Sequence, residues 1–163
     1  MAAGRLTLLP LTGIKLVEPG DDLGAIAVAA FSANGIVPEA GDVLVVAQKI
    51  VSKAEGRYVD VTTVEPSEGA VALAAEVDKD PRFVEVVLSE SKRVVRHRPG
   101  LLIVEHRLGF VMANAGIDHS NLPTQGGGEQ VLLLPEDPDG SARSLREYMA
   151  HVFGTDIGIV VSD

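Results

Sequence analysis

Apolar residues in this chain occur in short runs that end at glycine, proline or charged residues, and this pattern limits the folds it can adopt. Such runs are typical of strands, which we predict at residues 6–11, 43–47, 58–62, 101–104, 110–113, 131–134 and 157–161. Apolar residues at helical spacing predict helices at residues 22–34, 70–77, 81–91 and 141–153. Neither a repeat nor a sustained helix-bundle period is visible. We therefore expect an α+β protein with mixed sheets and flanking helices, with α/β as the alternative.

The composition determines what can fill the core. The chain has 163 residues, of which 46% are hydrophobic but only 4% aromatic, and it has no cysteine. This length suffices for one sizeable core, which Leu, Val, Ile and Ala must fill, so we predict a single domain over residues 1–163. The absence of cysteine excludes disulfides, thiolate metal sites and cysteine nucleophiles.

The formal net charge of −9 limits the possible ligands. Binding to nucleic acid requires a basic surface that contacts phosphates, so a general nucleic-acid binder is not expected. An acidic protein that binds a nucleotide needs local lysines, helix N-termini or bridging metal ions. The sequence shows no signal peptide and no apolar run of membrane-spanning length, so we expect a cytoplasmic protein with no membrane partner.

Residues 109–121, GFVMANAGIDHSN, combine an apolar run, small residues and a polar cluster. Small residues let a backbone approach a ligand closely. Asp118 and Asn121 offer a carboxylate and an amide three residues apart, which suits a divalent cation and a polar ligand group. The same residues also fit a strand followed by an Asx-type turn that caps the next element.

Residues 41–57, GDVLVVAQKIVSKAEGR, place polar side chains directly after a buried strand. Open sheets bind ligands at the carboxyl ends of their strands, so Lys49, Ser52 and Lys53 could meet phosphate oxygens there. The alternative is a solvated polar turn. The last apolar run brings Asp163 to the end of a strand, a position that suits a magnesium or manganese ion beside phosphates.

Other polar residues are expected to be structural. The glycines at 126–128 predict a loop, because no Gly-Lys-Ser/Thr follows them, and the four histidines lack the spacing of a zinc site. We expect Glu90, Arg93 and Arg96 to form solvated pairs on a helix.

Six motifs along the chain resemble those of the coenzyme F-420 gamma-glutamyl ligases, in the same order and with similar spacing. They are LLPLTGI, PGDDL, GDVLVVAQKIVSKAEGR, VEHRLGFVMANAGIDHSN, LLLPEDPD and IGIVVSD. The family attaches L-glutamate to a deazaflavin coenzyme precursor at the expense of GTP. The resemblance covers nearly the whole chain but only the N-terminal two-thirds of a family member, so residues 1–163 are expected to be part of a longer ligase domain with the family's own fold.

The resemblance also implies site residues, none of which is assigned as catalytic. Asp118 and Asp163 correspond to ligands of Mg²⁺ or Mn²⁺, and K⁺ is a further candidate cofactor. The positions that correspond to nucleotide contacts are Ile14, Lys15, Leu16, Val17, Gln48, Lys53 and Asn121. At Gln48 some relatives carry serine.

Three functional hypotheses follow. In the first, the chain is a GDP-forming ligase that joins L-glutamate to the deazaflavin coenzyme precursor through an acyl phosphate, and by resemblance it is a homodimer. In the second, it is a non-catalytic nucleotide-binding, metal-binding or assembly fragment, because the metal and nucleotide contacts that the family has after Asp163 are missing. A metal-dependent phosphohydrolase is the third, because aspartate-bound metals also activate water.

Overall fold

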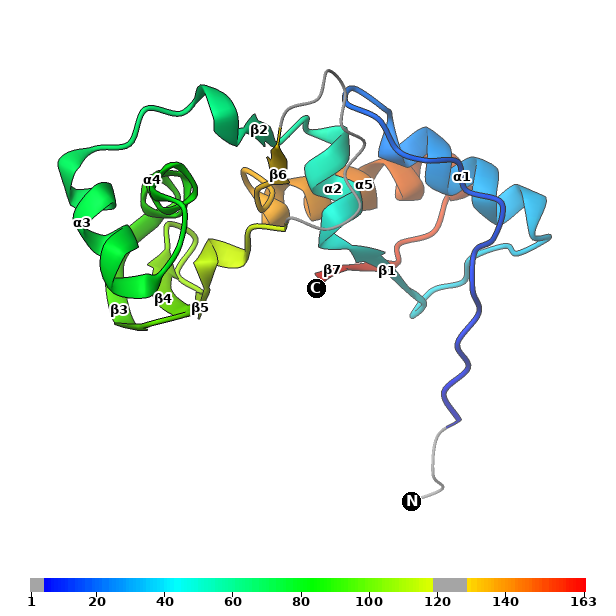
Figure 1. Ribbon diagram of the computed structural model, residues 1–163. Coiled ribbons are helices and arrows are strands. Elements are labelled where there is room, and N and C mark those ends of the chain that lie inside the picture. Colours follow the sequence, from blue (N-terminus) through cyan, green and yellow to red (C-terminus); the bar gives the residue numbers. More distant parts are fainter. Residues whose placement is uncertain (1–4, 119–128) are drawn as a thin grey trace.

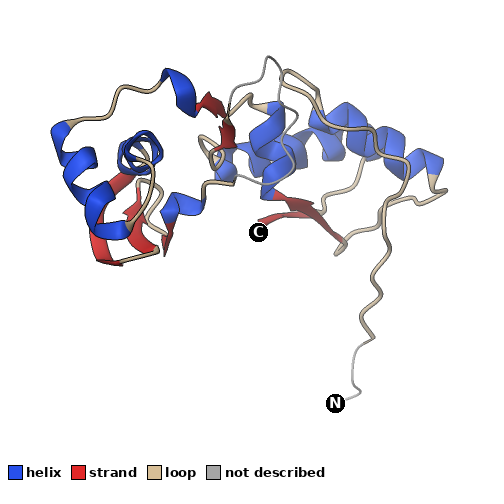
Figure 2. Ribbon diagram, in the orientation of Figure 1, coloured by secondary structure: helices blue, strands red, loops and turns tan. Residues whose placement is uncertain are grey.

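The computed structural model describes residues 5–118 and 129–163, which form two lobes (Figure 1). Along the chain its elements are α1 (Leu23–Ala33), β1 (Val43–Ala47), α2 (Gln48–Ala54), β2 (Tyr58–Asp60), the 3₁₀ turn η1 (Val61–Thr63), α3 (Glu68–Val77), α4 (Pro81–Ser89), β3 (Ser91–Arg98), β4 (Leu101–His106), β5 (Val111–Ala113), η2 (Asn114–Gly116), β6 (Gln130–Leu132), α5 (Pro138–Phe153) and β7 (Gly158–Ser162). Parallel and antiparallel strand pairs occur together, flanked by helices (Figure 2). The predicted α+β class with mixed sheets is confirmed.

The first lobe contains α1, α2, α5 and a parallel pair of strands, β1 and β7. These strands are far apart in the sequence and pair in register from Val43↔Gly158 to Ala47↔Ser162. One face of the pair packs on a core made by α1 and α5, which includes Phe31 and Met149. The opposite face carries Val43, Val45 and Val160, which are exposed.

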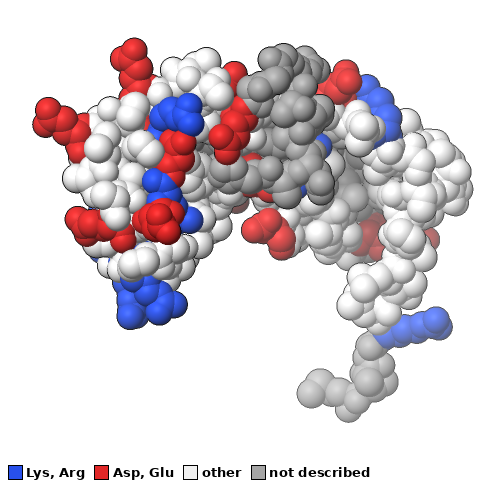
Figure 3. Space-filling model, viewed as in Figure 1, with Lys and Arg blue, Asp and Glu red and all other residues white. Residues whose placement is uncertain are grey.

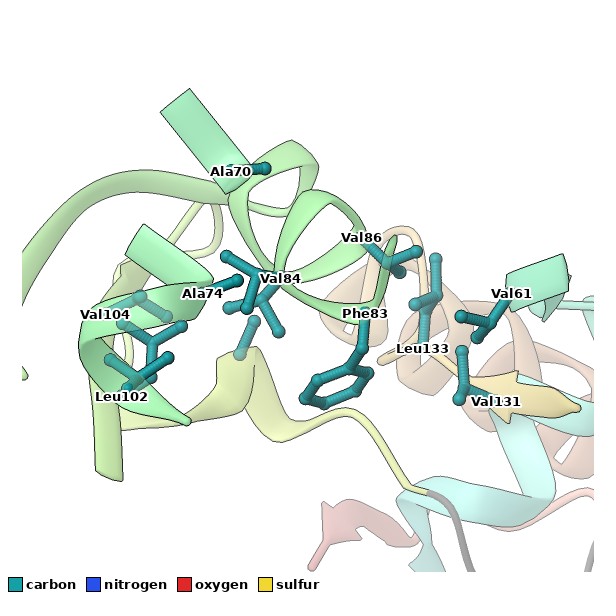
Figure 4. Close-up of a cluster of buried hydrophobic side chains, with 13 residues drawn as sticks. Val61, Ala70, Ala74, Phe83, Val84, Val86, Leu102, Val104, Val131 and Leu133 are labelled. Atoms are coloured by element: carbon teal, nitrogen blue, oxygen red, sulfur yellow. The ribbon is translucent and has the colours of Figure 1, made fainter. Parts of the chain in front are cut away.

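The second lobe contains α3 and α4 packed on an antiparallel sheet with strand order β3-β4-β5. Its core is made largely of valine and alanine, as the scarcity of aromatic residues requires. Phe83 contributes an aromatic ring to this core and lies in the close-up beside the side chains of Leu133 and Val131, which come from the chain between the lobes (Figure 4). The core of this lobe therefore continues into the residues that connect the two lobes.

Among the residues that the structure describes, two features connect the lobes. One is the antiparallel pair β2–β6. The other is a buried ionic cluster in which Arg57 and Arg107 donate to the same Glu90 oxygen, from Nη2 at 2.9 Å and from Nε at 3.0 Å. Burial would raise the pKa of the Glu90 carboxyl, but the hydrogen bond from Arg107 and the charge of Arg57 outweigh this effect and hold its pKa below the usual range. The connection therefore depends on an ionised carboxylate.

His106 lies fully buried next to Glu90. The backbone N–H of Leu108 donates to its Nδ1 at 3.0 Å, which leaves the proton of the neutral ring on Nε2, facing Glu90 Oε2 at 3.4 Å. Burial lowers the pKa of this imidazole, although the nearby Glu90 carboxylate opposes the effect. His106 is therefore a neutral core residue.

Side-chain caps fix most of the helix starts. Asp22, Ser67, Asp80 and Asp137 each accept a hydrogen bond from a backbone N–H in the first turn of α1, α3, α4 and α5. The predicted positions of α1, α3 and α4 are confirmed to within a few residues. Helix α5 begins earlier than Ser141, because Asp137 is the cap and Pro138 suits the first helical position.

Three local predictions are wrong. The segment 6–11 forms no strand, since no strand in the described ranges pairs with it, and Leu6 and Leu8 are each 82% exposed. The polar stretch after β1 is helix α2 rather than a turn. Arg93 and Arg96 lie on strand β3, not on a helix, and Glu90 is the buried C-terminal cap of α4. A strand can form from polar residues when its backbone pairs with a neighbour, as β3 does with β4.

The charged side chains show no continuous basic surface on the described part of the face in Figure 3, where acidic and basic groups are interspersed. No helix in the described ranges is long and apolar enough to cross a membrane.

Candidate functional site

The carboxyl ends of β1 and β7 meet at one edge of their sheet. The pair is parallel, and its last partners are Ala47 and Ser162, so the residues that follow them, Gln48 and Asp163, emerge side by side. This is the arrangement in which open sheets present ligand-binding groups. Strand pairing thus brings residues from distant parts of the sequence to one place.

Asp118 reaches this edge from the other lobe. Its backbone forms an isolated bridge with Leu132, in which each residue donates its N–H to the other's carbonyl at 2.9 Å. The preceding turn η2 contains Asn114 and Ala115 at positive φ values of 49° and 54°, which is uncommon for residues other than glycine. Such strain persists only where surrounding structure imposes it, so the chain before Asp118 has a tightly defined path.

These residues line a single cavity of about 380 Å³. Its lining consists of Ala47, Gln48, Lys49, Ile117, Asp118, Ser162 and Asp163. Three residues singled out from the sequence, Gln48, Asp118 and Asp163, therefore converge here. The Gln48 side-chain oxygen accepts a hydrogen bond at 3.1 Å from Ser52, which is fully buried one turn further along α2.

Lys49 supplies the positive charge of the cavity. It lies in the first turn of α2, and its ammonium group forms an ion pair with Asp118 Oδ2. The sequence identified Lys49 and Lys53 together as phosphate-binding candidates, and the resemblance favoured Lys53. Lys53 is half-buried, lies one helical turn further from β1 and does not line the cavity. Lys49 lies two residues after the end of the strand, but only the tertiary structure shows that this turn of α2 lines the cavity.

The remaining predicted contacts lie elsewhere. Lys15 pairs with Asp21 at 2.8 Å, Leu16 is exposed and Val17 is buried. The chain at Gly20 donates its N–H to Ala54, so this segment adjoins the C-terminal end of α2, whereas the cavity lies at its N-terminal end. Asn121 and the glycines at 126–128 lie outside the described residues.

A larger cavity of about 600 Å³ lies between α1, α2 and α5, with an acidic rim. Each rim carboxylate already has a structural partner. Asp22 and Asp137 cap helices, Asp21 pairs with Lys15, Glu136 pairs with Arg57, and Glu55 accepts from the Glu136 N–H and the Ser141 hydroxyl. The carboxylates of this rim stabilise helix ends and connections.

The smaller cavity suits a divalent cation in one respect. Mg²⁺ keeps several waters and is commonly bound by one or two carboxylates together with substrate phosphates. Asp118 and Asp163 provide two carboxylates, and the Lys49 ammonium at Asp118 shows that a cation already fits there. Within residues 5–118 and 129–163, no group of three or more His, Cys, Asp or Glu side chains could hold a metal by itself. A metal in this cavity would therefore need ligands beyond these two carboxylates.

The fold and the site define an α+β protein with a charged cavity at the carboxyl ends of two parallel strands. Comparison with known proteins identifies the family: residues 13–163 match the model of F420-0:Gamma-glutamyl ligase, and the chain belongs to this family. The family resemblance read from the sequence motifs is confirmed.

Three relatives are each named Coenzyme F420:L-glutamate ligase. The protein from Methanopyrus kandleri is 44% identical over 98% of this chain and 59% of its own length. The protein from Archaeoglobus fulgidus is 40% identical over 98% of this chain and 60% of its own, and that from Methanothermobacter thermautotrophicus is 36% identical over 97% and 61%. The chain thus spans about three-fifths of the length of these relatives.

Proposed function

We propose that this chain is part of a GTP-dependent ligase that adds L-glutamate to a deazaflavin coenzyme precursor. The family membership supports the substrate class. The observation that carries the proposal is the convergence of Gln48, Lys49, Asp118 and Asp163 on one cavity. Lysine and carboxylate-bound Mg²⁺ or Mn²⁺ are the groups that phosphoryl transfer requires.

The proposed reaction has two steps. A carboxylate oxygen of the precursor attacks the γ-phosphorus of GTP, the bond to the β-phosphate oxygen breaks, and GDP leaves. The amine of L-glutamate then attacks the acyl carbon, loses a proton and displaces phosphate, which leaves an amide. Both steps bring anionic groups together, so positioning and charge neutralisation supply most of the catalysis.

We propose a role for each of this chain's site residues. Asp118 and Asp163 would hold the metal ion, which neutralises the charge of the transferred phosphoryl group when it is bound. Gln48 and Lys49 line the same cavity, which supports a role for them in contacting phosphate oxygens. Lys53, Asn121 and the segment 14–17 are proposed to contact other parts of the nucleotide, and K⁺ remains a candidate for a second cation.

Titration of GDP into the protein by calorimetry, with and without Mn²⁺, tests this function. Metal-dependent GDP binding is expected, followed by GDP formation that requires both the deazaflavin precursor and L-glutamate. GDP binding that is the same with and without Mn²⁺ would contradict the metal site. Phosphate release without L-glutamate would indicate a phosphohydrolase instead.

A non-catalytic nucleotide-binding, metal-binding or assembly role is the second candidate, and the exposed apolar face of the β1–β7 pair favours it. Parallel sheets are generally covered on both faces, yet Val43 and Val45 are 56% and 60% exposed on one face here. A second copy of the chain is the proposed cover, consistent with the expected homodimer. Sedimentation at micromolar concentration is expected to show a dimer, and a monomer would contradict the homodimer of this chain. Full turnover by the isolated chain would refute a purely assembly role.

A further inference from the structure

Lys49 and Asp118 form an ion pair between elements that are far apart in the sequence. Lys49 belongs to α2, whereas Asp118 follows the turn η2 and is held by the bridge to Leu132. Their side chains are 31% and 21% exposed, so the pair is partly screened from solvent. Both residues line the cavity that Asp163 also lines.

This ion pair occupies one oxygen of a carboxylate that would bind the divalent cation. A cation that binds Asp118 competes with the ammonium group for this carboxylate, because two positive charges close to one carboxylate repel each other. Lysine suits such an exchange, since its ammonium is a compact point charge on a flexible four-carbon stem. An arginine in the same place would hold the carboxylate through a rigid fork and resist displacement.

We propose that Lys49 is an exchangeable counter-ion of the metal site. Without a divalent cation, Lys49 neutralises Asp118 and keeps its carboxylate in the cavity. When the cation binds, the ammonium group is displaced and becomes available to an anionic group in the same cavity. Lys49 therefore weakens the binding of the metal alone and couples metal binding to binding of an anion such as a phosphate. This inference rests on the metal site of the proposed function.

The coupling follows from charge alone. In the metal-free cavity, Asp118 competes with an incoming phosphate for Lys49. After the metal has taken over Asp118, that competition ends. Linkage is reciprocal, so the phosphate must raise the affinity for the metal by the same factor. A residue that only stabilises the fold would not change this factor.

The test compares wild type with Lys49→Met, which keeps a long flexible side chain but removes the charge. Lys92→Met is the matched control, because Lys92 is an exposed lysine on β3 and its loss changes the net charge equally. Circular dichroism establishes that all three proteins are folded. Mn²⁺ affinity is then measured by electron paramagnetic resonance without nucleotide, and GDP affinity by calorimetry with and without Mn²⁺.

Lys49→Met is expected to bind Mn²⁺ alone about fivefold more tightly than wild type, which corresponds to the upper end of a partly exposed ion pair. The factor by which Mn²⁺ raises GDP affinity is expected to fall about fivefold or more, while Lys92→Met stays within about twofold of wild type for both quantities.

Two results would overturn the inference in different ways. If wild type binds Mn²⁺ and Lys49→Met binds it equally or more weakly, Lys49 only positions Asp118, and the proposed function is unaffected. If neither protein binds Mn²⁺ with or without GDP, the metal site is wrong, and the proposed function fails together with the inference. If Lys49→Met does not fold, Lys49→Gln takes its place in the test. Glutamine keeps a hydrogen-bond donor for Asp118 but has no charge, so this variant is expected to show the same gain in Mn²⁺ affinity.

Discussion

Replacing Glu90 by glutamine tests the ionic connection between the lobes. The Glu90 side chain is 11% exposed, and one of its oxygens accepts hydrogen bonds from Arg57 and Arg107 at 2.9 and 3.0 Å. The amide oxygen of the glutamine side chain can occupy the same place, so both hydrogen bonds persist without the negative charge. The substitution therefore isolates the contribution of the charge.

The expected loss of unfolding free energy in Glu90→Gln follows from these two hydrogen bonds. A hydrogen bond to a charged group is worth roughly 1.5–3 kcal/mol, about twice a neutral one, so halving two of them costs roughly 1.5–3 kcal/mol. Both arginines keep other acceptors, the Leu134 and Glu136 carbonyls among them. We therefore expect Glu90→Gln to lower the free energy of unfolding by about 2 kcal/mol at pH 7, or to lower Tm by about 4–8 °C.

The pH dependence gives the sharper test. The folded pKa of Glu90 lies below its ordinary value of 4.5, so the carboxylate contributes stability above that pH and loses it as the pH falls through the folded pKa. The difference between wild type and Glu90→Gln should then shrink in acid. Urea unfolding measures both values. The control is Glu105→Gln, because Glu105 pairs with an arginine that is 64% exposed and should cost less than about 1 kcal/mol. Equal costs for the two variants, or a cost that does not change with pH, would refute the reasoning.

Three further predictions concern single residues. Asp118→Asn, a nearly isosteric change, should keep the fold but weaken metal-dependent GDP binding at least about tenfold, since a charged partner of the metal is lost. Lost stability with unchanged binding would make Asp118 a structural residue. In wild type, the lowered pKa of His106 means that the unfolded state binds more protons, so stability falls as pH drops through 6.5. His106→Asn should flatten this part of the stability profile, and an unchanged slope between about pH 7.5 and 5 would contradict it. In Gly24→Ala the new Cβ would lie 2.6 Å from the Tyr148 ring, so thermal unfolding should show a net loss of about 1 kcal/mol despite the better helix propensity of alanine. A stabilised variant would show that the ring moves freely.

Local chemistry in the sequence was sufficient for much of the secondary structure. Asp22 and Ser67 were recognisable as the starts of α1 and α3, because an N-cap side chain bonds the backbone only a few residues away, and Pro81 marked the start of α4. Short apolar runs likewise predicted β1, β4 and β7. These features depend on neighbours in the chain, so no knowledge of the tertiary structure was needed.

The sequence by itself also determined the chemistry available at the site, namely the carboxylates of Asp118 and Asp163 and lysines after the first strand. It could not determine which of these groups meet. Their convergence depends on the parallel pairing of β1 with β7 and on the bridge between Asp118 and Leu132, both of which join distant parts of the chain. The choice of Lys49 over Lys53 as the residue in the cavity was decided in the same way, because only the placement of α2 against β6 shows which turn of the helix faces Asp118. Side-chain chemistry is a local property of the sequence, whereas the cavity is made by backbone pairing between segments that no local pattern connects.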